Sequence, residues 1–374
     1  MKIGCVTEIK KHEYRVGLTP ANAAEYRAAG HEVHVQAGLG EGSSFSDAEY
    51  AAAGAVVLND AGEVWRKSDM LIKVKEPLRE EYGLMQKGQI IYTYLHLAAD
   101  PELTRAMMDS GATGVAYETL TDREGRLPLL MPMSEVAGRL SILEGAKYLE
   151  KPFGGRGVLL AGVPGTHRAK VVIIGAGIVG TNAAKIAVGF GARVTVMDVN
   201  LDRLRYLDDI FGAQIQTICS SSAAIRAELV DADLVIGSVL IPGKVAPKLI
   251  KREYLKDMMP GSVIVDVAVD QGGCSEVTRP TYHDNPTFVV DGVVNYCVAN
   301  MPGSTPRTST MALTNATLRY GLLIAGLGLE KACGRDAGIR NAINIHQGKC
   351  TYENVATSLN IPYTPLNELG GGAF

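Results

Sequence analysis

Three glycines and one aspartate have the spacing that a dinucleotide requires. Gly175, Gly177 and Gly180 follow an apolar run, and Asp198 comes eighteen residues after Gly180. The first glycine permits a tight turn, the second lets backbone approach a pyrophosphate, and the third lets a helix pack closely on a strand. The free N–H groups at the start of that helix favour phosphate. A carboxylate at Asp198 can hold the two ribose hydroxyls and would repel a 2′-phosphate, so the pattern predicts NAD rather than NADP.

A second set of polar residues stands where ligands of open α/β sheets bind, beyond the carboxyl ends of strands. Arg15 lies in the loop after the first predicted strand, Lys75 and His96 directly follow two others, and Ser238 and Asp270 follow strands of the glycine-motif domain. Arg15 and Lys75 suit a small carboxylate, because arginine pairs bidentately with planar anions. His96 suits proton transfer, since imidazole exchanges protons near neutral pH. Asp270 could orient or activate water or an amine.

Each of these residues also has a structural interpretation. A lone histidine after a strand is commonly a loop or cap residue, Lys75 and Glu76 could form an ordinary solvated pair, and Asp270 could cap a turn. Spacing alone does not decide between the functional and the structural interpretation of each residue. The other histidines, at positions 12, 31, 34, 167, 283 and 346, share no spacing and are interpreted as surface or structural residues.

The elements that position these residues alternate between strand and helix. Strands are predicted at residues 2–6, 32–36, 55–58, 70–74, 89–94 and 113–116, and helices at 20–29, 47–53, 61–66 and 101–110. Asp100 can cap the last of these helices, with Pro101 at its first position. This alternation predicts a mostly parallel, doubly wound sheet. Because no glycine fingerprint occurs in this region, we expect the dinucleotide to bind elsewhere.

The glycine motif belongs to a second doubly wound domain. It comprises a strand at 171–174, a helix at about 178–190 and a strand at 193–197, followed by strands near 214–218, 234–237, 262–267 and 287–290. An amphipathic helix at 134–150, with Ser134 as its N-cap, would link the domains. The tail from about residue 306 begins with a helix at 311–324, ends in glycine-rich coil and is too short for its own core. We therefore predict two Rossmann-like α/β domains separated by a cleft, residues 1–130 with 305–374 and residues 131–304.

Composition excludes several other classes of protein. The 374 residues carry a formal net charge of −3, which gives no electrostatic case for nucleic acid or an anionic membrane. The start of the chain has no apolar core of signal-peptide length, and no apolar stretch is long enough to span a membrane. Six cysteines are scattered without metal-ligand spacing, which indicates reduced thiols, no metal site and a cytoplasmic protein.

Seven stretches carry a resemblance to one family. They are residues 8–20, 74–77, 94–100, 131–139, 154–165, 266–273 and 300–303. On these stretches, and over essentially its whole length, the chain resembles the family that contains the alanine dehydrogenases and the NAD-binding part of pyridine nucleotide transhydrogenases. The resemblance implies an NAD-dependent enzyme for the reversible oxidative deamination of L-alanine to pyruvate and ammonium, assembled as a homohexamer.

The resemblance also implies a role for individual residues. Arg15 and Lys75 look like the groups that hold the carboxylate and carbonyl of the substrate, His96 like the acid/base, and Asp270 like a second catalytic residue beside the nicotinamide. Positions that match the lining of the NAD site are Ser134, Gly175, Gly177, Val179, Gly180, Asp198, Arg203, Ser220, Val239, Leu240, Val267, Asp270, Val298, Asn300 and Met301. Arg203 stands where some relatives have lysine, and either side chain could lie beside the adenosine ribose.

Two other functions remain open at this point. One is hydride exchange with an NADP(H)-binding partner, as in the transhydrogenases, which have further membrane and NADP-binding parts. The other is a regulatory protein that binds NADH without turnover and senses the ratio of NADH to NAD. The complete set of Arg15, Lys75, His96 and Asp270 favours the dehydrogenase over both.

Overall fold

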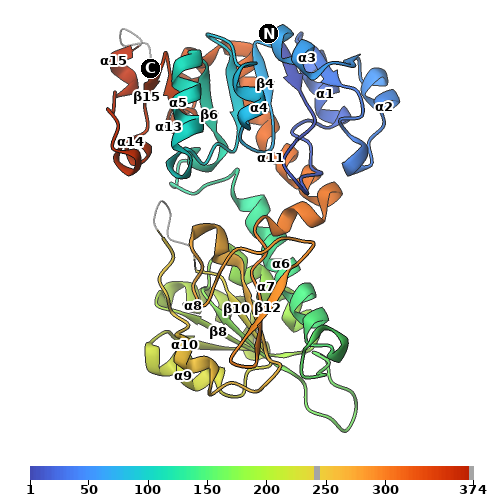
Figure 1. Ribbon diagram of the computed structural model, residues 1–374, viewed down its shortest axis with the longest axis vertical. Coiled ribbons are helices and arrows are strands. Elements are labelled where there is room, and N and C mark those ends of the chain that lie inside the picture. The colour runs from blue at the N-terminus through green and yellow to red at the C-terminus, as the bar shows by residue number, and fades with distance from the viewer. Residues whose placement is uncertain (240–244, 370–374) are drawn as a thin grey trace. The chain divides into compact units, whose positions relative to one another are not determined.

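The computed structural model describes residues 1–239 and 245–369, and it divides into two compact units (Figure 1). Unit 1 is Met1–Met133 together with the described residues from Thr305 onward, and unit 2 is Ser134–Ser304. Each unit is built on one twisted sheet with helices on its faces. The prediction of two doubly wound, Rossmann-like α/β domains is therefore confirmed.

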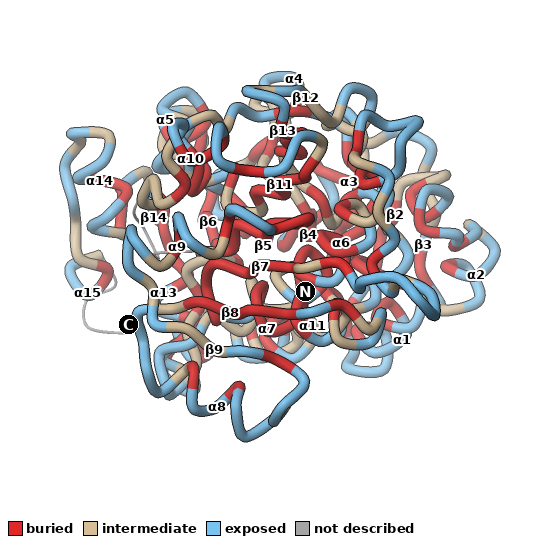
Figure 2. Tube along the Cα trace, turned by 90° about the horizontal axis from the view of Figure 1, so that it is seen from below, coloured by how far each residue is buried: buried red, intermediate tan, exposed pale blue. Residues whose placement is uncertain are grey.

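The sheet of unit 1 has eight strands in the order β15-β14-β6-β5-β4-β1-β2-β3 within the described residues. The six from β6 to β3 are parallel, whereas β14 is antiparallel to β6 and β15 to β14. The strands are β1 (Lys2–Cys5), β2 (Glu32–Gln36), β3 (Val56–Leu58), β4 (Met70–Ile72), β5 (Ile90–Thr93), β6 (Thr113–Ala116), β14 (Ile343–His346) and β15 (Lys349–Cys350). The inner strands β4, β5 and β6 are buried throughout, as covered parallel strands must be (Figure 2).

The helices of unit 1 begin where the sequence provides caps. Thr19 and Asp100 accept backbone N–H groups at the starts of α1 and α5, and each helix has proline at its first position. The helices are α1 (Pro20–Ala28), α2 (Asp47–Ala52), α3 (Ala61–Lys67), α4 (Arg79–Tyr82), α5 (Pro101–Ser110), α11 (Pro306–Leu327), α12 (Leu329–Arg335), α13 (Ala337–Ala342), α14 (Glu353–Leu359) and α15 (Leu366–Leu369), with 3-10 turns η1 (Glu41–Ser43), η2 (Leu97–Ala99) and η3 (Tyr117–Thr119).

The last part of the chain is more structured than the sequence predicts. The long helix α11 runs from Pro306 to Leu327, so it begins five residues earlier and ends three residues later than the predicted 311–324. Pro306 suits the start of a helix and Gly328 its end. After it, β14 adds to the edge of β6 and pairs with β15, where a coil was expected. In Figure 1 the red C-terminal elements gather beside α5 and β6. The expected glycine-rich end, residues 370–374, lies outside the described residues.

The sheet of unit 2 has the order β12-β13-β11-β10-β7-β8-β9 and is parallel except for β12. Its strands are β7 (Lys170–Ile174), β8 (Arg193–Asp198), β9 (Ile215–Cys219), β10 (Leu234–Gly237), β11 (Val263–Asp266), β12 (Thr287–Val290) and β13 (Val293–Tyr296). Its helices and 3-10 turns are α6 (Met131–Tyr148, whose first three residues belong to unit 1), α7 (Ile178–Gly189), α8 (Leu201–Phe211), α9 (Ser222–Leu229), α10 (Arg252–Leu255), η4 (Lys151–Phe153), η5 (Gly212–Gln214), η6 (Val267–Gln271) and η7 (Met301–Ser304).

The predicted start of α6 is wrong. The helix begins at Met131, so Ser134 lies inside its first turn rather than at the N-cap. The reason is Pro132, whose missing N–H costs nothing in a first turn, where backbone N–H groups have no partner within the helix. Among residues 1–239 and 245–369, no helix combines the length and apolarity needed to cross a bilayer.

Candidate active site and dinucleotide site

The glycine motif forms the turn between β7 and α7 in unit 2. Gly175 has φ 110°, a conformation that L side chains rarely adopt. A Cβ on Gly180 would stand 1.8 Å from the carbonyl oxygen of Gly175, so only glycine lets the helix approach the turn this closely. At Gly177 a Cβ would meet no atom of residues 1–239 or 245–369 within 4 Å. Gly177 is the N-cap of α7, and the first N–H groups of a helix have no partner within the helix.

Asp198 and Arg203 both contact the middle of this turn at Ala176. The Asp198 carboxylate, at the end of β8, accepts the backbone N–H of Ala176 at 2.6 Å and that of Asn200 at 2.8 Å. Arg203 donates from Nε and Nη2 to the Ala176 carbonyl at 3.0 and 2.8 Å, and from Nη2 to Thr181 Oγ1 at 3.1 Å. Arg203 therefore braces the turn, a role that the sequence did not indicate.

The other sequence-predicted positions of unit 2 follow its strands or begin its helices. Ser220 follows β9, and its N–H donates to the Asp198 carbonyl at 2.9 Å. Asp270 is exposed and lies in η6, which directly follows β11. In the sheet, β10 lies between β11 and β7. The rest are Ser134 in α6, Val179 in α7, Val239 after β10, Val267 at the start of η6, Val298 after β13, Asn300 before η7 and Met301 at its first position. Leu240 lies outside the described residues.

Ser238 is engaged in the turn rather than available for chemistry. Its hydroxyl is 2.9 Å from the carbonyl oxygens of both Ile174 and Gly175. Ser238 is also buried, so this side chain tethers the end of β10 to the end of β7. The role of Ser238 is therefore structural.

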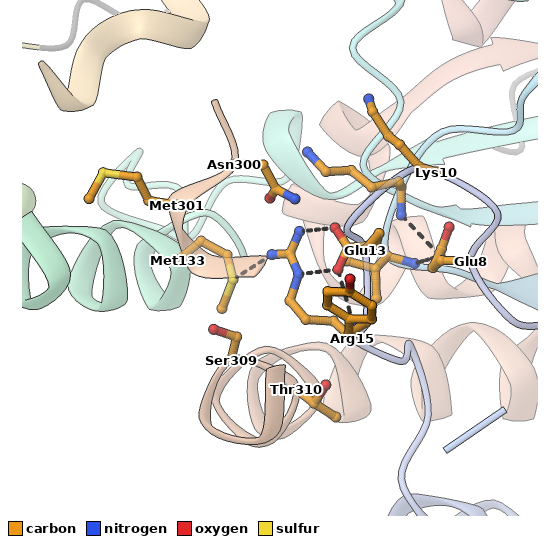
Figure 3. Close-up of polar contacts among 12 residues, drawn as sticks. Glu8, Lys10, Glu13, Arg15, Met133, Asn300, Met301, Ser309 and Thr310 are labelled. Atoms are coloured by element: carbon orange, nitrogen blue, oxygen red, sulfur yellow. Dashed lines mark hydrogen bonds and ion pairs between the residues drawn. The ribbon is translucent and has the colours of Figure 1, made fainter. Parts of the chain in front are cut away.

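In unit 1, Arg15 is held in one orientation by Glu13 (Figure 3). Its Nε and Nη2 donate to the two Glu13 carboxylate oxygens at 2.7 and 2.5 Å, and Nη1 donates to Met133 Sδ at 3.0 Å. Both side chains of this ion pair are buried. Burial alone would lower the pKa of the Arg15 guanidinium, but Glu13 raises it above the ordinary arginine value, so the cation is retained.

The loop that carries Arg15 is fastened to the C-terminal helix α11. The backbone N–H of Val16 donates to Thr310 Oγ1 at 3.1 Å, and the Ser43 hydroxyl lies 2.9 Å from the same oxygen. Thr310 and Ser43 are both fully buried. Helix α11, near the end of the chain, thus helps to position Arg15, near its beginning.

Lys75 lies at the end of a segment that a buried charge cluster organises. Glu8 Oε1 accepts the backbone N–H groups of Val74 and Lys75 at 2.6 and 3.2 Å. The other Glu8 oxygen pairs with Lys73 Nζ at 3.1 Å, and Lys73 also pairs with Glu81 at 2.9 Å. Burial raises the pKa of Glu8, whereas Lys73 opposes that effect. This Glu8–Lys73–Glu81 cluster joins the turn after β1, the end of β4 and helix α4.

His96 begins the turn after β5 in a left-handed conformation, with φ 51°. Its backbone N–H donates to Glu118 Oε1 at 2.6 Å, and its ring lies nearly parallel to that of Tyr94, with the ring centroids 5.9 Å apart. Nδ1 lies 3.3 Å from Glu76 Oε2, and the side chain is 45% exposed. An accessible imidazole with one nitrogen facing a carboxylate can exchange protons through the other.

The structure thus brings Arg15, Lys75 and His96 to the carboxyl ends of β1, β4 and β5, which are neighbours in one sheet. It also reveals four acidic residues whose roles sequence reasoning missed, namely Glu8, Glu13, Glu76 and Glu118. Each follows a strand end or lies in the first loop, so the rule that selected His96 could have selected them. Within the described residues, no group of three or more His, Cys, Asp or Glu could hold a metal ion.

The fold and these two sites define a two-domain oxidoreductase that uses a dinucleotide: one Rossmann-like unit carries the glycine turn, and the other presents two cations and a histidine. Family models agree with this class. Residues 4–137 match the alanine dehydrogenase/PNT N-terminal domain, and residues 141–353 match the alanine dehydrogenase/PNT C-terminal domain. The chain belongs to the alanine dehydrogenase/PNT family.

Individual relatives match over nearly their full length. Alanine dehydrogenase of Mycolicibacterium smegmatis is 53% identical over 364 residues, which are 97% of this chain and 98% of the relative. That of Bacillus subtilis is 54% identical over 370 residues, 98% of this chain and 97% of the relative. A solved L-alanine dehydrogenase superposes with TM-score 0.94 at 49% identity, covering 96% of this chain and 99% of its own. A transhydrogenase from Sinorhizobium meliloti, at TM-score 0.83 and 24% identity, shares the fold.

Proposed function

We propose that this protein is an L-alanine dehydrogenase, which reversibly converts L-alanine, water and NAD⁺ into pyruvate, ammonium, NADH and a proton. The observation that carries the proposal is the placement of Arg15, Lys75 and His96 at the ends of three adjacent strands. Two cations beside a proton-exchanging group suit a small oxo or amino acid with one carboxylate. The relatives, which are more than half identical over nearly the whole chain, carry the name of this enzyme.

Arg15 would anchor the substrate carboxylate. Glu13 occupies the Nε–Nη2 edge of its guanidinium and fixes the plane of the group. The Met133 thioether at Nη1 is a weak acceptor, so a carboxylate would replace it readily. The ion pair with Glu13 thus orients the fork before the substrate arrives, which reduces the entropy that binding costs.

Lys75, His96 and Asp270 would manage charge and protons at the reacting carbon. The Lys75 ammonium would stabilise the oxygen of the carbinolamine that forms when water adds to the substrate iminium. Asp270 would position that water, and His96 would help to take up its proton. Transfer of the proton back to the departing nitrogen would then release ammonia.

The residues of unit 2 fit a bound NAD, and we propose that unit 2 is the cofactor domain and unit 1 the substrate domain. Gly177 and the N-terminus of α7 would hold the pyrophosphate, and Asp198 the ribose hydroxyls. When bound, NAD supplies the hydride acceptor of the reaction. The remaining matched positions would line the site, namely Ser134, Gly175, Val179, Gly180, Arg203, Ser220, Val239, Val267, Asp270, Val298, Asn300 and Met301.

We further propose a cytoplasmic homohexamer. The assembly rests on the resemblance to the family alone. The location is supported by the cysteines, which are free thiols at positions 5, 219, 274, 297, 333 and 350.

The deciding experiment is NADH oxidation by the purified protein with pyruvate, with and without ammonium. Turnover that requires both compounds is expected, and His96→Ala should lower it by about two to four orders of magnitude while NADH still binds. Oxidation with pyruvate alone would indicate a hydroxy-acid dehydrogenase and remove Asp270 from its role. Tight NADH binding without turnover would favour a transhydrogenase component or a sensor.

A further inference from the structure

Glu76 lies between His96 and Lys10, and the mechanism above gives it no role. It follows β4, whereas His96 follows β5, the adjacent strand. Glu76 Oε2 is 3.3 Å from His96 Nδ1, and Glu76 Oε1 forms an ion pair with Lys10 Nζ. The Glu76 side chain is 11% exposed, against 45% for His96. A largely buried carboxylate therefore contacts the inner nitrogen of an accessible imidazole.

The surroundings of Glu76 keep it ionised. Burial works against its charged form, yet the hydrogen bond with His96 and the charges of His96, Lys10 and Lys75 hold the pKa of Glu76 well below its usual range. From α4, the phenol of Tyr82 also faces this charge, and burial together with nearby carboxylates raises the pKa of Tyr82 to about 12. Tyr82 is thus neutral, and Glu76 remains a carboxylate at any pH at which the enzyme would work.

An ionised carboxylate can only accept a hydrogen bond, so the nitrogen that faces it must carry the proton. In neutral His96 this is the Nδ1–H tautomer, which leaves the lone pair on Nε2. The backbone of His96 is fixed separately, because Glu118 accepts its N–H at 2.6 Å. Two carboxylates thus act on His96, one through the backbone and one through the ring.

We propose that Glu76 is a positioning residue that holds the His96 ring in place in its Nδ1–H tautomer, so that Nε2 exchanges the proton with the substrate. The proposal rests on the proposed function, in which His96 handles that proton. Glu76 acts through His96 and need not touch the substrate. Lys10 contacts the other oxygen of Glu76, so it bears on the orientation of the carboxylate but not directly on the imidazole.

The test begins with Glu76→Gln, which keeps the size of the side chain and removes its charge. We expect kcat for reductive amination of pyruvate to fall about 10- to 100-fold, the usual cost of losing a group that orients a functional histidine. The Kd for NADH should stay within about twofold.

Two further variants separate this role from a general effect of charge or folding. Glu102→Gln neutralises an exposed carboxylate that pairs with Arg79, and it should leave kcat unchanged. Lys10→Gln breaks the ion pair at Oε1 and keeps the contact at Oε2, so its kcat should fall much less than that of Glu76→Gln. Equal losses in Lys10→Gln and Glu76→Gln, or a His96 tautomer that Glu76→Gln leaves unchanged, would overturn the proposal.

The double variant distinguishes failure of this proposal from failure of the proposed function. If Glu76 acts through His96, Glu76→Gln should cause no further loss in a His96→Ala background. Independent, multiplying losses would refute the positioning role alone, and wild-type turnover by His96→Ala would remove His96 from the mechanism. Failure of the wild-type protein to oxidise NADH with pyruvate and ammonium would instead refute the proposed function itself. Long-range ¹⁵N–¹H spectra of histidine-labelled protein give a readout without turnover: wild type should show neutral His96 protonated at Nδ1, and Glu76→Gln a mixture of tautomers.

Discussion

The Glu118 carboxylate accepts the backbone N–H of His96 at 2.6 Å, and the same oxygen accepts that of Leu95 at 3.1 Å. These bonds join the turn after β6 to the turn after β5 and hold His96 at φ 51°. A residue other than glycine is strained in this left-handed region by about 1–2 kcal/mol. This strained backbone conformation persists because Glu118 stabilises the turn. The turn thereby fixes the direction in which the His96 side chain leaves the backbone.

Glu118→Ala should release this turn. We expect kcat to fall about tenfold and the free energy of unfolding to fall by about 1–3 kcal/mol, the cost of leaving polar backbone groups without their partner. Glu118→Gln retains an acceptor oxygen and should lose less of both. Steady-state kinetics with urea unfolding checks this pair, and equal behaviour of the two variants would show that the hydrogen bonds do not hold the turn.

The buried Glu8–Lys73–Glu81 cluster predicts a large effect from one substitution. Lys73→Met leaves two carboxylates buried beside each other without their cation, and loss of one partner of a buried ion pair costs about 3–5 kcal/mol. Lys67→Met is the matched control, because Lys67 pairs with Glu63 on the exposed face of α3. Urea denaturation of both variants measures the difference. A Lys73→Met protein as stable as the control would mean that Glu8 and Glu81 become neutral at no cost.

Much of the fold follows from local signals in the sequence. The segment from β7 to β8 lies within a residue of its predicted bounds, because each strand is a run of β-branched residues and each turn has its glycine. Helix α5 begins at Pro101 with Asp100 as its cap, as predicted. Strand β13 was missed although Asp291-Gly292, with φ 48° and 83°, is a strong signal for a two-residue hairpin after β12.

The partners of the site residues could not be predicted in the same way. Glu76 and His96 are 20 residues apart, and Glu8 and Val74 are 66 apart. Their contacts depend on which strands become neighbours in the sheet, and no local pattern encodes that order. Strand β14 is a similar case, because a short run such as Ile343–His346 becomes a strand only when the edge of β6 is available to it.

His34 predicts a pH dependence of stability. It lies in β2, and burial lowers its pKa below the ordinary value in the folded protein. The unfolded chain therefore binds a proton at His34 more readily than the folded one, so the stabilisation is present above about pH 6.5 and is lost as the pH falls through the folded pKa. Urea midpoints at pH 7, 6 and 5 should fall more steeply for wild type than for His34→Gln. Parallel curves for the two proteins would contradict this assignment.

Asp198 predicts the choice of cofactor. Its carboxylate stands at the end of β8 beside the glycine turn, where a 2′-phosphate would meet a negative charge. Asp198→Ala should lower the ratio of kcat/KM for NAD to that for NADP by about tenfold or more, since the negative charge that repels the 2′-phosphate of NADP is removed. Asp202→Ala, which removes an exposed carboxylate in the first turn of α8, should keep the wild-type ratio. An unchanged ratio in Asp198→Ala would place the ribose elsewhere.

Gly177 and Gly180 differ in what a methyl group would do, although they share one motif. Alanine at position 177 fits the backbone, where φ is −70°, and meets no atom of the described part of the chain within 4 Å, so Gly177→Ala should unfold at the wild-type temperature. The added methyl group would occupy the space that the pyrophosphate needs, and we expect NADH binding to weaken at least about tenfold. Alanine at position 180 would collide with the Gly175 carbonyl oxygen at 1.8 Å, so Gly180→Ala should lose about 1–3 kcal/mol of stability, as overpacking does. Thermal unfolding and NADH fluorescence titration of the two variants separate the effects, and an intact NADH affinity in Gly177→Ala would move the pyrophosphate away from α7.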